Sequence, residues 1–240
     1  VSAKIAVGLT LDEIRIANTP ASFEPTLDYI VTKVARFPFD KFSDASNKLG
    51  TQMKATGEVM SIGRTMEESL LKAVRSLETG VCHIYHKKFD KWSNDDLLAY
   101  IKGGTDDRLY AIGQLIRNGV DLALIYDKTK IDMFFLEKFK NIVEFENVVR
   151  AHPMDVETLR AAKRMGFSDK YIGQLWGLSQ NEMYRLREKN NVFPVYKMID
   201  TCASEFASYV PYFYSTYEQE NESIVSEREK IIVLGSGPIR

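Results

Sequence analysis

The chain has 240 residues, a formal net charge of −1 and 45% hydrophobic residues. This length holds one large domain or two small ones with a proper core, and the near-neutral charge argues against a general affinity for nucleic acid or anionic lipid. The sequence has no apolar run long enough to span a bilayer. The two cysteines, Cys82 and Cys202, are too few for a disulfide framework and indicate a reducing, cytoplasmic compartment.

The first third of the chain has the pattern of mixed α/β structure. Residues 3–14 predict a helix, and residues 26–37 predict a strand because they are rich in β-branched and aromatic side chains. A second strand is expected over residues 58–62. A helix follows from Thr65, where the Thr65 hydroxyl and the Glu68 carboxylate have the spacing of a capping box.

From residue 79 onward the sequence predicts one helix after another. Each is expected to begin at a side chain that accepts a hydrogen bond from the first turn, and several are expected to end at glycine. The expected caps are Asn94, Asp106 or Asp107, Thr129 with Asp132, Asp155, Ser168, Ser179 with Glu182, and Asp200 or Thr201, and the closing glycines are Gly103, Gly119 and Gly166.

Residues 230–240 read as a buried strand that enters a glycine-rich turn. Glycines such as Gly235 and Gly237 let backbone amides approach an anion, but a lone Gly-x-Gly is a weak sign of a phosphate site. A nucleotide-binding unit normally continues there into a helix. We therefore expect this chain to be a middle slice of a longer protein.

Cys82-His-x-x-His86 has the residue types of a metal cluster. Zinc requires three or four such ligands, and the remaining histidine and cysteine, His152 and Cys202, lie far away in the sequence. The pattern therefore favours polar surface histidines at a domain junction over a metal site.

Residues 168–189 have the length and capping of a helix-turn-helix. A DNA-binding regulator built on residues 155–190 is one interpretation, but acidic and basic residues are nearly balanced there, whereas DNA readers present a basic face. A compact three-helix packing unit is the favoured alternative. In the DNA interpretation the second helix would read bases with Gln180, Asn181, Tyr184 and Arg185.

Aromatic residues recur over residues 209–217, next to the acidic Glu218, Glu220 and Glu222. A stacking groove for nucleic acid needs cations beside the rings, so packing is the favoured use of these residues. The sequence shows no catalytic triad, carboxylate pair or Walker loop. Nor does it show the convergent polar residues of a self-contained ligand-binding protein, which is a third interpretation.

Four ordered stretches resemble one family, the large subunit of carbamoyl-phosphate synthase. Residues 20–37 resemble the stretch near the end of its first ATP-grasp half, and residues 51–65 resemble the segment that finishes that half. Residues 194–206, followed by residues 214–218, look like the exit from its central helical domain. Residues 229–240 look like the first strand and turn of its second synthetase half.

The resemblance implies a mainly α fold with a small α/β part. Residues 1–78 would be the C-terminal piece of the first ATP-grasp domain, residues 79–222 a helical oligomerisation domain, and residues 223–240 the start of the second half. The whole enzyme would make carbamoyl phosphate, for arginine and pyrimidine synthesis, from bicarbonate, ammonia from a glutaminase small subunit, and two ATP with Mg²⁺ or Mn²⁺. This segment is expected to self-associate and to be inactive alone, with no nucleic-acid or membrane partner.

Only one site residue carries over from the family. Glu58, in Gly-Glu-Val-Met, matches a glutamate associated with the tunnel through which the family passes its unstable intermediates. The alternative is that Glu58 starts a strand and pairs with a basic neighbour such as Arg64, while Arg64 and Thr65 fix the strand-to-helix turn. The family's metal-binding Glu-Met-Asn motif is absent, so no catalytic, cofactor-binding or metal residue is predicted here.

Overall fold

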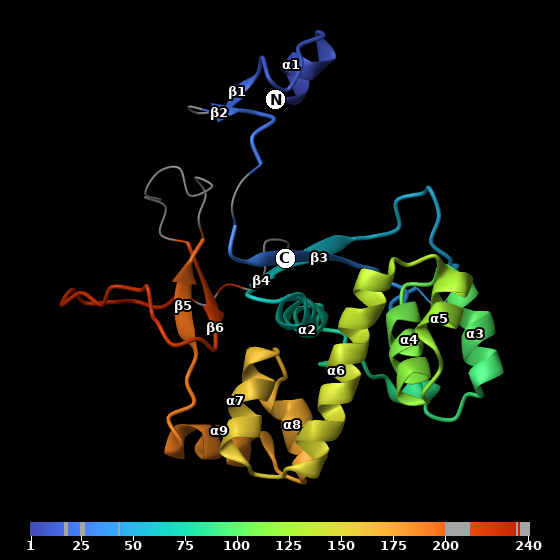
Figure 1. Cartoon of the computed structure of the whole chain (residues 1–240), viewed down its shortest axis with the longest axis vertical. Coiled ribbons are helices and arrows are strands. Elements are labelled where there is room, and N and C mark those ends of the chain that lie inside the picture. The colour runs from blue at the N-terminus through green and yellow to red at the C-terminus, as the bar shows by residue number, and fades with distance from the viewer. Residues whose placement is uncertain (17–18, 25–26, 43, 200–211, 234, 236–240) are drawn as a thin grey trace. The chain divides into compact units, whose positions relative to one another are not determined.

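The computed structural model divides the chain into two compact units (Figure 1). The small unit comprises residues 1–28 and 199–212, and the large unit comprises residues 29–198 and 213–240. The structure describes residues 1–16, 19–24, 27–42, 44–199, 212–233 and 235.

The small unit contains a short helix, α1 (Ser2–Ala6), and two paired strands, β1 (Arg15–Ile16) and β2 (Thr19–Pro20). The prediction of a helix over residues 3–14 is therefore wrong beyond its first turn. Gly8 has a φ of +96°, which ends the helix at a conformation that glycine tolerates. Helix α1 buries none of its residues, so no packing extends it.

The large unit begins with an antiparallel hairpin of β3 (Ile30–Arg36) and β4 (Gly57–Gly63), which confirms both predicted strands. Helix α2 (Met66–Ser76) packs against both strands. The Thr65 hydroxyl accepts a hydrogen bond from the Glu68 amide at 3.2 Å, as predicted. The Glu68 carboxylate accepts from the amide of Arg64 at 2.8 Å, so it reaches one residue further back than a capping box requires.

The helical part of the large unit is built around α6, which contacts α2, α4, α5, α7 and α8. Apolar stripes from these helices and from α2 join in one core. No helix in the described part of the chain is long and apolar enough to cross a membrane. The bounds are η1 (Lys87–Phe89), α3 (Asn94–Lys102), α4 (Arg108–Arg117), α5 (Leu122–Thr129), α6 (Met133–Ala151), α7 (Val156–Arg164), α8 (Asp169–Trp176) and α9 (Gln180–Lys189).

Three of the predicted caps are confirmed, and each accepts a backbone hydrogen bond in the first turn of its helix. They are Asp155 of α7, Ser168 of α8 and Ser179 of α9, the last in a capping box with Glu182. Helix α6 is capped by Asp132, three residues after the predicted Thr129.

Three predicted caps differ from the structure. Ser93 rather than Asn94 caps α3, because the Ser93 hydroxyl accepts from the third helical amide at 3.1 Å. Asp107 precedes α4 without a side-chain cap, because its carboxylate binds Lys88 instead. Thr129 ends α5, a helix that the sequence did not predict, and its hydroxyl donates back within that helix. The predicted cap at residues 200–201 lies outside the described residues.

An antiparallel pair of strands, β5 (Val195–Met198) and β6 (Phe213–Thr216), follows the helices and was not predicted. The Lys72 ammonium donates to the Ser215 carbonyl, and the Thr216 hydroxyl donates to the Glu68 carboxylate at 3.1 Å, so β6 is tied to α2. Tyr214 is buried and Tyr217 packs against the core. Packing is therefore the use of these two aromatic residues, as expected.

The strand predicted near the end of the chain, at residues 231–234, is wrong over its described part. Residues 230–233 form no strand, and Ile231, Ile232 and Val233 are exposed. A strand needs a neighbour to satisfy its backbone groups, and none of the described strands pairs with this segment.

Candidate functional site

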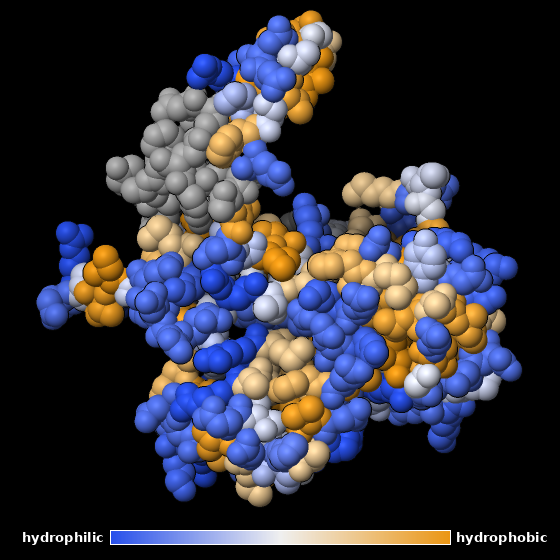
Figure 2. Space-filling model, viewed as in Figure 1, coloured by the Kyte–Doolittle hydropathy of each residue, from blue (hydrophilic) through white to orange (hydrophobic). Residues whose placement is uncertain are grey.

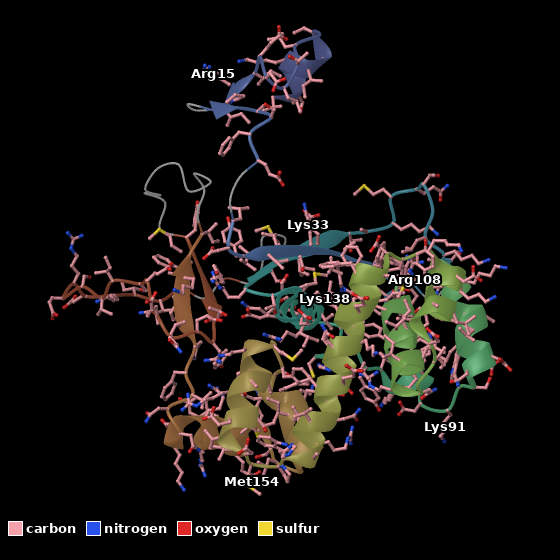
Figure 3. The ribbon with its side chains drawn as sticks, viewed as in Figure 1. Arg15, Lys33, Lys91, Arg108, Lys138 and Met154 are labelled. Atoms are coloured by element: carbon pink, nitrogen blue, oxygen red, sulfur yellow. The ribbon has the colours of Figure 1, made fainter. Side chains whose placement is uncertain are left out.

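Glu58 lies on β4, opposite Ala35 of β3. Its carboxylate is 2.9 Å from the ammonium of Lys33, its diagonal neighbour across the hairpin, and the Glu58 side chain is 44% exposed. Lys33 projects from the hairpin on the side away from α2 (Figure 3). Glu58 thus pairs with a basic neighbour, as the sequence led us to expect, but this neighbour is Lys33, whereas the sequence analysis named Arg64; the Glu58 carboxylate remains accessible from solvent.

The two histidines of Cys82-His-x-x-His86 serve separate structural contacts. The Nδ1 atom of His86 accepts from the Lys88 amide at 3.0 Å and caps η1. His83 is only 1% exposed, which corrects the prediction of a surface histidine. Within the described residues, no group of three or more His, Cys, Asp or Glu side chains is placed to hold a metal ion.

A buried polar network explains the position of His83. Its Nε2 atom is 2.9 Å from Oε1 of Glu146 on α6, and Arg117 on α4 donates from Nε to Oε2 of the same carboxylate at 2.8 Å. Arg117 also donates to the Ile84 carbonyl at 3.0 Å. The network joins the 79–87 segment, α4 and α6 in the middle of the helical part.

Burial and hydrogen bonding set the charges in this network. Burial lowers the pKa of His83 below its ordinary value, against the hydrogen bond to Glu146. Burial would raise the pKa of Glu146, but the hydrogen bonds from His83 and Arg117 outweigh it and hold this pKa below its ordinary value. We therefore assign a neutral His83 that donates Nε2–H to an ionised Glu146.

A second buried network ties α7, α8 and α9 together. The Lys163 ammonium lies 2.8 Å from Oδ1 of Asp169 and donates to the Phe167 carbonyl at 2.9 Å. Arg187 donates from Nε to Oδ2 of Asp169 at 2.9 Å. Burial lowers the pKa of Lys163 to about 8.

These contacts decide the interpretation of residues 155–190. The four predicted base-reading residues are exposed on α9, but Lys163 and Arg187 point into the protein and neutralise Asp169. Trp176 anchors α8 to α6 by donating to the Val149 carbonyl at 2.6 Å. The favoured three-helix packing unit is confirmed, and no observation supports the DNA-binding alternative.

Hydrophobic side chains remain exposed where α5 turns into α6. We call this surface the aromatic corner. It consists of Phe134 and Phe135 at the start of α6, which are 49% and 41% exposed and have their ring centroids 5.3 Å apart; Leu124 and Tyr126 of α5 are also exposed, at 39% and 42%. Figure 2 shows hydrophobic residues at the surface in the region of α4 and α5. Aromatic residues are enriched at the centres of protein–protein interfaces, so this corner has the chemistry of a contact surface.

Residues 58–191 match the family model of the carbamoyl-phosphate synthetase large chain, oligomerisation domain. The match covers more than half of the chain. The chain belongs to this family. The matched region runs from β4 through α2 to the first residues after α9, so it includes both buried networks and the aromatic corner. The mainly α fold and the structural role that the resemblance implied are confirmed.

Sequence reasoning missed the two buried networks of this oligomerisation domain. His83 and Glu146 are 63 residues apart, so no local pattern joins them. One signal was present. Glu146 falls on the stripe formed by Phe139, Ile142 and Val143, where a carboxylate predicts a buried cationic partner.

Proposed function

We propose that the chain is the central, non-catalytic segment of a carbamoyl-phosphate synthase large subunit, and that its helical part holds copies of that subunit together. The family match over residues 58–191 carries this proposal. The whole enzyme would act in the cytoplasm and make carbamoyl phosphate from bicarbonate, ammonia and two ATP. ATP and its Mg²⁺ or Mn²⁺ would bind in the flanking ATP-grasp halves, and a glutaminase subunit would supply the ammonia.

In this proposal the boundaries at residues 78 and 222 separate three parts with different functions: the end of the first synthetase half, the contact domain and the start of the second half. The hairpin of β3 and β4, with α2, would complete the first synthetase half, and the helices from α3 to α9 would form the contact domain. The packing of α2 against α6 supports a firm junction between them. Asn141 and Lys138 on α6 both reach Glu67 of α2, at 2.9 Å and 3.5 Å.

The proposal predicts that this chain alone does not turn over ATP. The test is ATP hydrolysis by the purified chain with bicarbonate and Mg²⁺ present and absent. We expect equal, background rates under both conditions. A bicarbonate-dependent rate that grows with protein concentration would refute the non-catalytic role.

We further propose that Glu58 lines the passage for the unstable intermediates in the whole subunit. The solvent-accessible carboxylate of Glu58 supports this role. The test is Glu58→Gln in the whole large subunit, with Lys33→Met as the matched control. A tunnel role predicts that ATP hydrolysis continues while less carbamoyl phosphate forms per ATP in the Glu58 variant only. Unchanged coupling in both variants would contradict it.

A further inference from the structure

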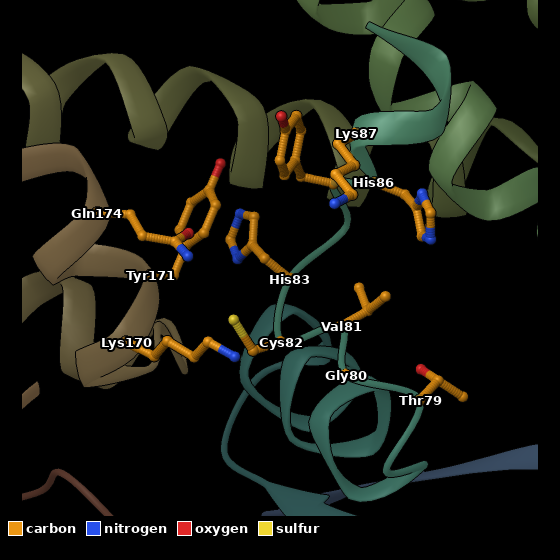
Figure 4. A pocket seen from close by; sticks show the side chains of 11 residues that line it. Thr79, Gly80, Val81, Cys82, His83, His86, Lys87, Lys170, Tyr171 and Gln174 are labelled. Atoms are coloured by element: carbon orange, nitrogen blue, oxygen red, sulfur yellow. The ribbon is translucent and has the colours of Figure 1, made fainter.

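A cavity of about 350 Å³ opens beside the segment that connects α2 to η1 (Figure 4). One wall is formed by residues 79–87, and the other by Lys170, Tyr171 and Gln174 on α8. The residues that line it come from two elements far apart in the sequence, and none of them is an Asp or a Glu. A negatively charged ligand therefore meets no carboxylate among these lining residues.

The inner wall of this cavity carries an unused hydrogen-bond acceptor. His83 is 1% exposed, and with Nε2–H donated to Glu146 its Nδ1 atom holds a free lone pair. Nδ1 is buried and has no hydrogen-bond partner among the described residues. The Tyr171 ring stacks on the imidazole with 3.8 Å between centroids, which fixes the orientation of the ring. A buried acceptor of this kind calls for a donor from a water or a ligand.

The mouth of the cavity carries positive charge. The Lys170 and Lys87 side chains line it, both residues are exposed, and neither forms an ion pair with a described carboxylate. Figure 4 shows Lys170 and Gln174 extending from α8 toward the segment that carries Cys82 and His83. The cavity thus combines ammonium donors at its rim with an acceptor on its inner wall.

We propose that this cavity binds a small oxyanion that carries its own hydroxyl group, of the hydrogenphosphate type. The charged oxygens would face the ammonium groups of Lys170 and Lys87, and the P–O–H group would donate to Nδ1 of His83. Sulfate has the same shape but carries no proton at neutral pH, so it offers this acceptor no hydrogen bond. The site therefore selects for the protonated oxyanion by hydrogen-bond polarity as well as by charge.

The test is a titration of the full chain with inorganic phosphate at pH 7, monitored by the ¹⁵N resonances of the histidine rings. We expect the His83 Nδ1 resonance to move with a saturable curve and a dissociation constant on the order of 1 mM. Sulfate at equal ionic strength should leave this resonance in place. A response to neither anion, or an equal response to both, overturns the proposal.

A matched pair of lysine variants separates the site from general charge attraction. Lys170→Gln removes an ammonium from the rim and should weaken phosphate binding on the order of fivefold. Lys189→Gln removes an exposed lysine from α9, outside the cavity, and should leave the affinity unchanged. An unchanged His83 Nε2 resonance in both variants verifies that the network is intact. Equal loss of affinity in the two variants contradicts a specific site.

Discussion

Arg117 and Glu146 form a two-point ion pair that joins α4 to α6 in the interior of the helical part. Nε of Arg117 donates to Oε2 of Glu146 at 2.8 Å, and Nη2 donates to Oε1. The same Oε1 atom also accepts a hydrogen bond from Nε2 of His83. Such an ion pair fixes geometry because two N–H groups of the guanidinium meet the two oxygens of the carboxylate. The relative placement of α4, α6 and the 79–87 segment depends on it.

Glu146→Gln should destabilise the chain strongly. The substitution keeps the shape but leaves the Arg117 guanidinium buried without its counter-charge, which costs roughly 3 kcal/mol. The control is Glu144→Gln on the same helix, where an exposed pair with Lys140 at 3.5 Å is lost and the change should stay within about 0.5 kcal/mol. Urea unfolding measures both. A loss below about 1 kcal/mol for Glu146→Gln contradicts the role assigned to this carboxylate.

Acid should destabilise the chain in two steps. The folded state holds the pKa of His83 below its ordinary 6.5. Below pH 6.5 the imidazole therefore binds a proton in the unfolded chain but stays neutral in the folded chain, so the free energy of unfolding decreases as the pH falls. It also holds the pKa of Glu146 below 4.5, so the stability that Glu146 contributes above pH 4.5 is lost as the pH falls through the folded value. Each group contributes at most about 1.4 kcal/mol per pH unit.

The measurement is the free energy of unfolding between pH 7 and pH 4 for the wild type and for His83→Gln. The wild type should lose stability continuously. The variant should lack the part of the slope that sets in below pH 6.5. Identical slopes above pH 5 would show that His83 is not the titrating group.

Gly113→Ala should destabilise α4, although alanine is the better helix former by about 1 kcal/mol. A Cβ atom at Gly113 would lie 2.5 Å from the Ile84 carbonyl oxygen, so α4 and the 79–87 segment would have to separate. Overpacking of this kind costs about 1–3 kcal/mol. Thermal unfolding measures the loss, and Gly50→Ala, where the added atom meets open space, is the control. A raised melting temperature for Gly113→Ala would contradict the close approach.

Lys72→Met should loosen β6 from α2. The Lys72 ammonium donates to the carbonyls of Ser215 and Ile62, and it lies 3.4 Å from the Glu68 carboxylate. Loss of a hydrogen bond from a charged donor changes a local opening equilibrium by about tenfold. Hydrogen exchange of the amides of residues 213–216 should accelerate by this factor, whereas Lys33→Met should leave it unchanged. Equal exchange in Lys72→Met and wild type would refute the link.

Local chemistry made much of the helical part predictable. Asp155, Ser168 and Ser179 were recognised because a cap and the first turn it serves lie within four residues. The failures involve partners outside that window. Strand β5 pairs with β6, which lies beyond residue 211, and no periodicity in Val195–Met198 predicts this pairing.

The site was less predictable than the fold because its parts come together only in three dimensions. Glu58 was named from a resemblance, and its partner Lys33 lies on the neighbouring strand. For Cys82-His-x-x-His86 the sequence favoured surface histidines at a domain junction, whereas His83 is buried. The cavity instead depends on Tyr171 and Lys170, contributed by a helix more than eighty residues away. Charge balance did predict correctly that residues 155–190 form a packing unit.

The central claim is that this domain exists for contact between copies, and sedimentation equilibrium across a range of chain concentrations tests it most directly. We predict a mass that rises with concentration for the wild type and for Tyr184→Asp, an exposed substitution on α9. Phe134→Asp, at the aromatic corner, should shift the association to at least tenfold higher concentration. This shift corresponds to a loss of about 1.4 kcal/mol in the free energy of association. A wild-type chain that stays monomeric at every concentration would contradict the account.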